Sequence, residues 1–286
     1  MTGISNAMAD PLVIAHRGGT GDTPENTVQA FHNALANGAD ALWMTVQISQ
    51  DGVPVMYRPA DLSALTDGHG KVNTLPVVAI QRLNAGFTFE QMDSDQQRRY
   101  PYRTHPLPIP TLRQALASVP ENVPIMLDMK QAPAAPLVRA VAQTLDDLHA
   151  WSRVRLYSTD PEALQLMAAY PQAHVFETRD ATRERLVQVA LAGVCENPPA
   201  PGSWIGIELD RKVEVIEHFT LGEGVSKVEA HWWTPAAVRC FTLRGDVHIV
   251  AFGVDSAEDY RRAAALGLDA VMTDSPKLMR VQKLAD

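Results

Sequence analysis

The chain has 286 residues, a formal net charge of −8 at pH 7 and a sequence pI near 5.6. Hydrophobic residues make up 46% of it and charged residues only 20%, which is typical of a globular protein with a substantial core. The acidic balance argues against a nucleic-acid partner or an anionic membrane surface, because both require a basic face. No apolar run approaches the roughly 20 residues that span a bilayer, so we expect no transmembrane segment.

The N-terminus and the cysteines say little about the compartment. Residues 1–10 have neither the basic start nor the apolar centre of a secretory signal, and we interpret them as a tag or a disordered N-terminus. Cys195 and Cys240 form no recognisable metal or redox spacing and neither require nor exclude an oxidising compartment. A cytoplasmic and a periplasmic location both stay open, and nothing indicates an oligomeric state.

Short apolar runs alternate with amphipathic segments along the chain. The strand-like runs are 12–16, 41–48, 53–58, 125–130, 154–157, 173–176, 204–209, 225–231, 247–252 and 270–273. Helical spacing recurs at 27–36, 79–83, 111–118, 137–148, 161–169, 183–192, 235–243 and 257–266. Asp51-Gly52 predicts a hairpin between 41–48 and 53–58, and Thr111 is a plausible N-cap.

This alternation predicts parallel βαβ units in an α/β fold. Eight such units closing on themselves form a TIM (β/α)8 barrel, which we expect as one domain over 11–286 with an insertion at about 59–108. A doubly wound open sheet is the competing architecture. One of the runs 204–209 and 225–231 is surplus to an eight-strand count, and the pattern does not say which.

Polar residues follow the first strand directly. His16 can shuttle a proton near neutral pH, and Arg17 offers a planar fork of donors suited to a phosphate. Glu25 and Asn26 come just before the first helix. A His-Arg pair that merely caps a strand end is the alternative interpretation.

Ordered motifs along the chain point to a family. They are His16-Arg17-Gly18, Pro24-Glu25-Asn26-Thr27, Gly38-Ala39-Asp40, Asp51-Gly52-Val53-Pro54-Val55, Leu83-Asn84-Ala85-Gly86, Ile109-Pro110-Thr111-Leu112, Leu127-Asp128-Met129-Lys130 and Gly267-Leu268-Asp269-Ala270-Val271-Met272-Thr273-Asp274-Ser275-Pro276. With these the chain resembles the glycerophosphodiester phosphodiesterases over about residues 12–280. The resemblance implies a TIM barrel of the phospholipase C-like phosphodiesterase type, with a role in lipid metabolism. It also implies two catalytic histidines and a divalent metal, Mg²⁺ or Ca²⁺, on the phosphate.

The chain departs from that pattern where the family binds its metal. Trp43 and Thr45 stand at the family's Glu-x-Asp positions, and only Asp128 keeps an acid. Arg58 stands at the position of the second catalytic histidine and Pro59 at that of the aspartate after it. Because a hard cation prefers several oxygen ligands, we expect the Mg²⁺ or Ca²⁺ to be absent and no other cofactor to replace it.

The remaining cations take over the metal's charge role in this interpretation, since a guanidinium also stabilises an oxyanion. Bacterial phosphatidylinositol-specific phospholipases C are similar in using an arginine in place of a metal. The predicted phosphate ligands are Arg17, Arg58 and Lys130.

His16 is the predicted first acid–base group. His231 is the first candidate for the second and His69 the next, although both also suit a surface position. The supporting residues are Glu25, Asn26, Asp128, Trp43 and Phe252. Trp43 would fill the space of the absent metal, and Phe252 would line the site or the core.

Three functional hypotheses follow. The first is a metal-independent phosphodiesterase acting on a glycerophosphodiester or lysophospholipid, with a small-molecule phosphodiester as partner. The second is a catalytically inactive barrel that binds an anionic ligand or a protein partner. The third is a different enzyme on the same scaffold.

Overall fold

The structure is a computed structural model that describes residues 10–284. Apart from Asp10, the tag or disordered segment expected at 1–10 lies outside the described residues. None of the helices within 10–284 is long and apolar enough to cross a membrane.

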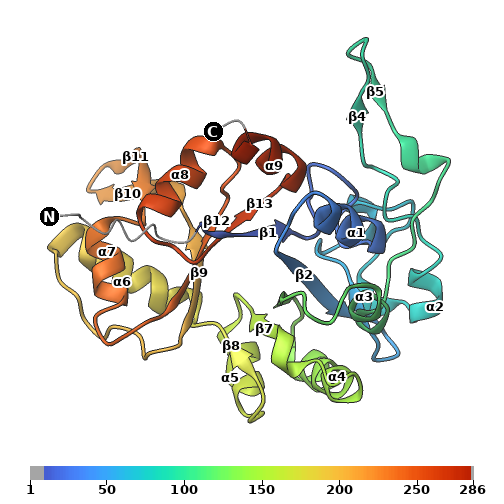
Figure 1. Ribbon diagram of the computed structural model, residues 1–286, viewed down its shortest axis with the longest axis horizontal. Helices are drawn as coiled ribbons and strands as arrows, with labels where there is room; N and C mark the ends of the chain where they lie inside the picture. The colour runs from blue at the N-terminus through green and yellow to red at the C-terminus, as the bar shows by residue number, and fades with distance from the viewer. Residues whose placement is uncertain (1–9, 285–286) are drawn as a thin grey trace, which may run out of the picture.

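Within 10–284, eight parallel strands form a ring in which the strand order is β8-β7-β6-β2-β1-β13-β12-β9 (Figure 1). Their bounds are Leu12–His16 (β1), Ala41–Ile48 (β2), Ile125–Met129 (β6), Val154–Tyr157 (β7), His174–Val175 (β8), Trp204–Glu208 (β9), His248–Phe252 (β12) and Ala270–Thr273 (β13). A parallel bridge between Phe176 and Trp204 links β8 to β9, and Glu177 N–H donates to Trp204 O at 2.8 Å. The predicted TIM barrel is therefore confirmed, and an open doubly wound sheet is wrong.

Helices surround the ring. They are Val28–Ala36 (α1), Leu112–Ser118 (α3), Ala134–Asp147 (α4), Pro161–Ala168 (α5), Arg179–Ala192 (α6), Pro235–Phe241 (α7), Ala257–Ala265 (α8) and Pro276–Leu284 (α9). Thr111 accepts a hydrogen bond from Gln114 N in a full capping box, which confirms the predicted N-cap. Thr27 caps α1 in the same way through Ala30 N. Both helices begin where a hydroxyl satisfies an otherwise unpaired backbone N–H.

The segment 59–108 lies on the side of the barrel away from α6 and α7 (Figure 1). It follows β3 (Pro54–Met56), which pairs antiparallel with β2 as Asp51-Gly52 predicts. It contains three 3-10 turns (Leu62–Ala64, Val72–Thr74 and Pro101–Arg103), the helix α2 (Val77–Ile80) and the small strands β4 (Gln91–Met92) and β5 (Arg98–Arg99). Val72, Leu62 and Ile80 are fully buried in an apolar cluster of their own, so part of this segment is firmly packed.

The run 225–231 is the surplus strand. It belongs to β11 (Gly222–His231), which pairs antiparallel with β10 (Asp210–Phe219) in a two-stranded ribbon outside the barrel. The sequence analysis missed β10 because its valines and isoleucine alternate with charged residues and most of its side chains lie in solvent. Run 204–209 supplies the barrel strand β9.

Cys195 and Cys240 form a disulfide between the segment after α6 and helix α7. Their separation of 45 residues is far outside the short metal or redox spacings, so the sequence carried no signal for this bond. Folding of the barrel wall brings them together.

Candidate functional site

A cavity of about 320 Å³ lies where several barrel strands end at their carboxyl side. Its lining is His16, Arg17, Trp43, Arg58, Asp128, Lys130, Tyr157, Thr159, Arg179, Glu208, Phe252, Gly253, Met272 and Asp274. Seven of the site residues expected from the sequence therefore meet here: His16, Arg17, Trp43, Arg58, Asp128, Lys130 and Phe252. Glu25 and Asn26 lie behind this lining, and His231 and His69 are not part of it.

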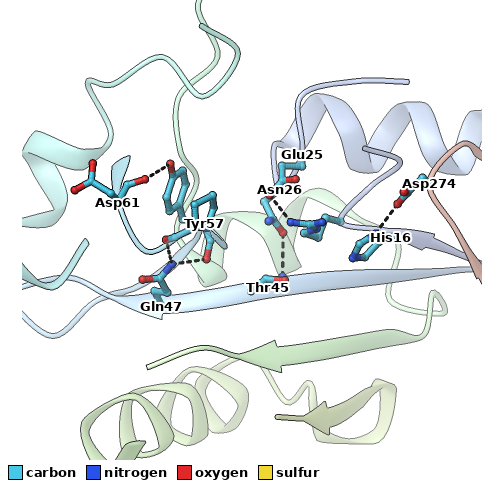
Figure 2. A network of polar contacts seen from close by, with 10 residues as sticks. His16, Glu25, Asn26, Thr45, Gln47, Tyr57, Asp61 and Asp274 are labelled. Atoms are coloured by element: carbon cyan, nitrogen blue, oxygen red, sulfur yellow. Dashed lines mark hydrogen bonds and ion pairs between the residues drawn. The ribbon is translucent and has the colours of Figure 1, made fainter. Parts of the chain in front are cut away.

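His16 ends β1, and its ring lies against Asp274, which follows β13. His16 Nδ1 is 2.5 Å from Asp274 Oδ1 (Figure 2). A carboxylate can only accept, so Nδ1 carries the proton and Nε2 of the neutral ring is left as an acceptor. The hydrogen bond from His16 lowers the pKa of Asp274 below its ordinary value, against the opposing effect of partial burial.

Asp274 was not among the site residues expected from the sequence. The available signal was its position immediately after a predicted strand, where barrel enzymes place functional groups. β1 and β13 are neighbouring parallel strands, so the residues that end them meet.

Arg17 is tied to Glu25 behind the lining. Arg17 Nη1 donates to Glu25 Oε1 at 2.9 Å, and Asn26 N donates to Arg17 O at 2.8 Å. Arg17 and Asn26 both have left-handed backbone, with φ of 51° and 57°, which costs about 1 kcal/mol or more each. Burial raises the pKa of Glu25, although the neighbouring Arg17 opposes that rise. One arm of Arg17 is thus occupied, while its buried Nε has no hydrogen-bond partner.

Asn26 also orients the end of β2. Its Oδ1 accepts from Thr45 N at 2.9 Å, while its buried Nδ2 and the Thr45 hydroxyl have no hydrogen-bond partner (Figure 2). These unpaired polar atoms lie beside the position where the family carries a metal ligand. The Asn26 amide and the Thr45 hydroxyl thus make this end of β2 polar but uncharged.

Arg58 follows β3 and is held by its backbone. Gln47 Nε2 in β2 donates to both flanking carbonyls, Tyr57 O at 3.1 Å and Pro59 O at 2.9 Å (Figure 2). Tyr57 is buried, and its hydroxyl donates to Asp61 O at 3.0 Å. The Arg58 guanidinium forms an ion pair with no residue in the described part of the chain, so its donors are available to a ligand.

Asp128 and Lys130 form the third part of the lining. Lys130 Nζ lies 3.2 Å from Asp128 Oδ1 and donates to Thr159 Oγ1 at 2.9 Å. Asp128 is 6% exposed, and burial raises its pKa although Lys130 opposes the rise. The pair contributes one buried carboxyl and one ammonium to the cavity.

Aromatic rings make up the floor. The Trp43 ring centroid lies 5.0 Å from that of Tyr157 and 5.1 Å from that of Phe252, and Phe176 packs on the same cluster. Trp43 is 3% exposed. Tilted and edge-to-face contacts of this kind stabilise aromatic clusters beyond their buried area. Trp43 is therefore a core residue that also lines the cavity.

The charges of the cavity are more balanced than the sequence analysis expected. Four cationic and three acidic side chains line it, so the expected excess of cations is largely neutralised. Besides the pairs of Arg17 and Lys130, Arg179 at the start of α6 donates to Glu208 at the end of β9 at 2.5 Å. Neither Arg179 nor Glu208 was named from the sequence, because their pairing depends on how α6 packs on β9. Within residues 10–284, Arg58 is the lining cation without an ion pair.

His231 and His69 lie elsewhere. His231 Nδ1 is 2.6 Å from Asp210 Oδ1 on the β10–β11 ribbon, and its side chain is 59% exposed. His69 is exposed in the segment 59–108. The cavity therefore contains one histidine among the described residues, and neither candidate for a second acid–base group reaches it.

The donors present do not fit the family's divalent metal. Trp43 has no oxygen, Thr45 offers one neutral hydroxyl, and the Asp128 carboxylate faces an ammonium at 3.2 Å. Across 10–284 no three His, Cys, Asp or Glu side chains are grouped so that they could hold a metal ion.

The fold and the site together define a TIM barrel with a polar, arginine-bearing cavity at the carboxyl ends of its strands. The model of the glycerophosphoryl diester phosphodiesterase family matches residues 16–278, and the chain belongs to that family. The resemblance stated from the sequence motifs is thereby confirmed.

Two relatives place the chain within the family. An uncharacterized protein of Mycobacterium tuberculosis, Rv2277c, is 47% identical over 267 residues, covering 93% of this chain and 88% of the relative. The crystal structure of its glycerophosphoryl diester phosphodiesterase domain superposes with a TM-score of 0.88 at 45% identity, covering 96% of this chain and all of that one. Human glycerophosphodiester phosphodiesterase 1 is 33% identical over 118 residues, 41% of this chain and 33% of that protein.

A more distant structure shares the fold alone. An Oleispira antarctica phosphodiesterase, in complex with the product sn-glycerol-3-phosphate, has a TM-score of 0.68 at 21% identity. The alignment covers 96% of this chain and 97% of that one.

Proposed function

We propose that the cavity binds a phosphodiester, a glycerophosphodiester or lysophospholipid, and cleaves it without a divalent metal. The supporting observation is that the His16–Asp274 pair and the unpaired guanidinium of Arg58 line one cavity. A general base and a cation on the phosphate are two of the elements that a metal-free phosphoryl transfer requires, and a proton donor to the leaving group is the third.

His16 Nε2 accepts the proton of the attacking hydroxyl, which belongs to water or to the alcohol of the substrate. Asp274 keeps the imidazole in the required tautomer and stabilises the imidazolium that forms. The new O–P bond forms as the bond to the leaving alcohol breaks. Arg58, Arg17 and Lys130 hold the phosphate oxygens, and the Lys130 ammonium donates a proton to the leaving oxygen. Solvent then takes the proton from His16 and restores the Lys130 ammonium, so that no net proton is gained or lost by the site.

A phosphodiester-binding barrel without catalysis is the second candidate function. It is favoured by the single histidine of the described cavity, because the family's chemistry employs two acid–base histidines. A binder needs Arg58 and the other cations but not His16 Nε2. The two candidates therefore differ in what the His16 side chain must do.

Turnover of glycerophosphocholine and of a lysophospholipid, measured in EDTA and then with added Mg²⁺ or Ca²⁺, separates the two candidates. The metal-free enzyme is active in EDTA and loses that activity in His16→Ala. Binding of the diesters without turnover supports the second candidate. Activity that appears only after metal is added contradicts the proposal.

We also propose that the protein works in an oxidising compartment, such as a bacterial periplasm. The support is the Cys195–Cys240 disulfide, a bond that is rare in reducing cytosol. Thiol labelling of the protein in intact cells tests this: free thiols at both cysteines contradict it.

A further inference from the structure

A second cavity, of about 500 Å³, adjoins the first. Arg58, Lys130 and Thr159 line both, so the two are adjacent. The segment 59–108 supplies another wall of the second cavity through Ala60, Lys71 and Asn73. None of the functional steps above uses this space.

The second cavity is cationic. Arg58, Lys71 and Lys130 face it, and Asp160 is its one acidic lining residue. Asp160 is already engaged, because its Oδ1 caps α5 by accepting from Glu162 N at 3.0 Å. Lys71 forms no ion pair with any residue from 10 to 284. Two cations without ion pairs, Arg58 and Lys71, therefore face one space.

The backbone of Lys71 is held in place, while its side chain is exposed. Its carbonyl accepts from Thr74 N at 3.0 Å and from Thr74 Oγ1 at 2.7 Å. The next residue, Val72, is fully buried in the apolar cluster of the segment. The Asn73 amide also lines the wall, whereas Gln47 Nε2 and Gln131 Nε2 already donate to backbone carbonyls. A lysine ammonium without an ion pair, beside the Asn73 amide and Arg58, suits a phosphate.

We propose that this second cavity binds a second phosphate group, carried by the alcohol part of the substrate. This inference rests on the proposed function, since it requires the first phosphate to lie between His16 and Arg58. Arg58 stands between the two cavities and contacts both phosphates. The preferred substrate is then a phosphodiester whose alcohol bears a further phosphate.

The test compares glycerophosphoglycerol with the same molecule phosphorylated on its distal hydroxyl. Calorimetric binding is measured on the full-length His16→Ala protein, which leaves the ligands uncleaved, in EDTA at about 0.15 M salt, which limits the influence of distant charges. Turnover is measured on the unchanged protein. We expect the phosphorylated ligand to bind about 10-fold more tightly, and Lys71→Ala to reduce that ratio by about 3- to 10-fold.

Lys227→Ala is the matched control, because it removes the same charge from a side chain that is 78% exposed on the ribbon. We expect it to leave the ratio intact. Equal affinity for both ligands, or an equal ratio in Lys71→Ala and Lys227→Ala, contradicts the second phosphate site. Tight, Lys71-dependent binding without turnover supports the site and contradicts only the catalytic proposal. Turnover of both ligands with no Lys71 dependence contradicts only the site.

Discussion

Two histidines of this chain lie beside an aspartate, and their surroundings differ. His16 and Asp274 approach to 2.5 Å at the ends of neighbouring buried strands, and both line a cavity. His231 and Asp210 approach to 2.6 Å on a ribbon whose side chains lie mostly in solvent. Asp210 also accepts from Arg262 on α8, so its charge is shared.

The two pairs have the same chemical groups in different settings. What distinguishes His16 is its place at the carboxyl end of a barrel strand, beside a cation without an ion pair and an aromatic floor. Exposure does not separate the two pairs, because the side chains of His16 and Asp274 are 24% and 51% exposed and those of His231 and Asp210 are 59% and 22% exposed. Replacements of three residues, each paired with a change on the ribbon, test how far the barrel end and the ribbon differ.

Replacement of His16 carries the largest expected effect. His16→Ala removes the general base, and kcat/KM for a glycerophosphodiester in EDTA should fall about 10³-fold. His231→Ala is the matched change on the ribbon and should stay within about twofold of the unchanged protein, since surface substitutions are usually close to neutral. Comparable losses of kcat/KM in both variants would show that His231 also takes part in the reaction.

Replacement of Trp43 tests the packing of the barrel end. Trp43→Ala leaves a hole among Tyr157, Phe176 and Phe252, and the free energy of unfolding should fall by about 3–5 kcal/mol. Urea denaturation measures it. Leu221→Ala, at a fully exposed side chain of the ribbon's turn, should change the stability by less than about 0.5 kcal/mol. A Trp43→Ala protein as stable as Leu221→Ala would show that the aromatic cluster is not a cooperative part of the core.

Replacement of Asp274 has a smaller expected effect on catalysis. Asp274→Asn keeps the shape but no longer selects the His16 tautomer, and kcat should fall about 10²-fold. Asp210→Asn is the control on the ribbon and should leave kcat close to its original value. A kcat in Asp274→Asn as high as in Asp210→Asn would show that the carboxylate does not orient His16.

The stability of Asp274→Asn should also depend on pH. The folded-state pKa of Asp274 lies below its ordinary value. The ionised carboxylate therefore stabilises the fold at any pH above the unfolded-state pKa of about 3.9. This contribution is lost as the pH falls through the lower folded-state pKa. The stability difference from the unchanged protein should be largest near pH 7 and shrink in acid. A difference that grows in acid would contradict the assigned direction.

Local patterns explain which parts of the fold could be predicted. Asp51-Gly52 and Thr111 form the hairpin and the helix cap expected of them, because a turn and a cap depend on residues within a few positions. The barrel follows from the alternation of apolar runs with helices. β10 was missed, since charged residues interrupt its apolar residues and leave no continuous apolar run.

The site was predictable only in part. His16, Arg58 and Lys130 could be placed at one mouth because strand ends of a barrel meet there. Asp274 could have been placed there by its position after a predicted strand, but its pairing with His16 and that of Glu208 with Arg179 could not, since nothing in the local sequence says which side chains meet. For the same reason the sequence suggested an excess of positive charge that the ion pairs largely cancel.

The sequence by itself determined the order of strands and helices, the family, and the replacement of two acidic positions by Trp43 and Thr45. Each of these depends on a short pattern of neighbouring residues or on the type of residue at a single position. Only the tertiary structure decided that His16 meets a residue 258 positions away, that Cys195 meets Cys240, and that Lys71 joins Arg58 in a second cavity. Such contacts arise when the hydrophobic core closes the barrel, and the closure sets distances that no local pattern encodes.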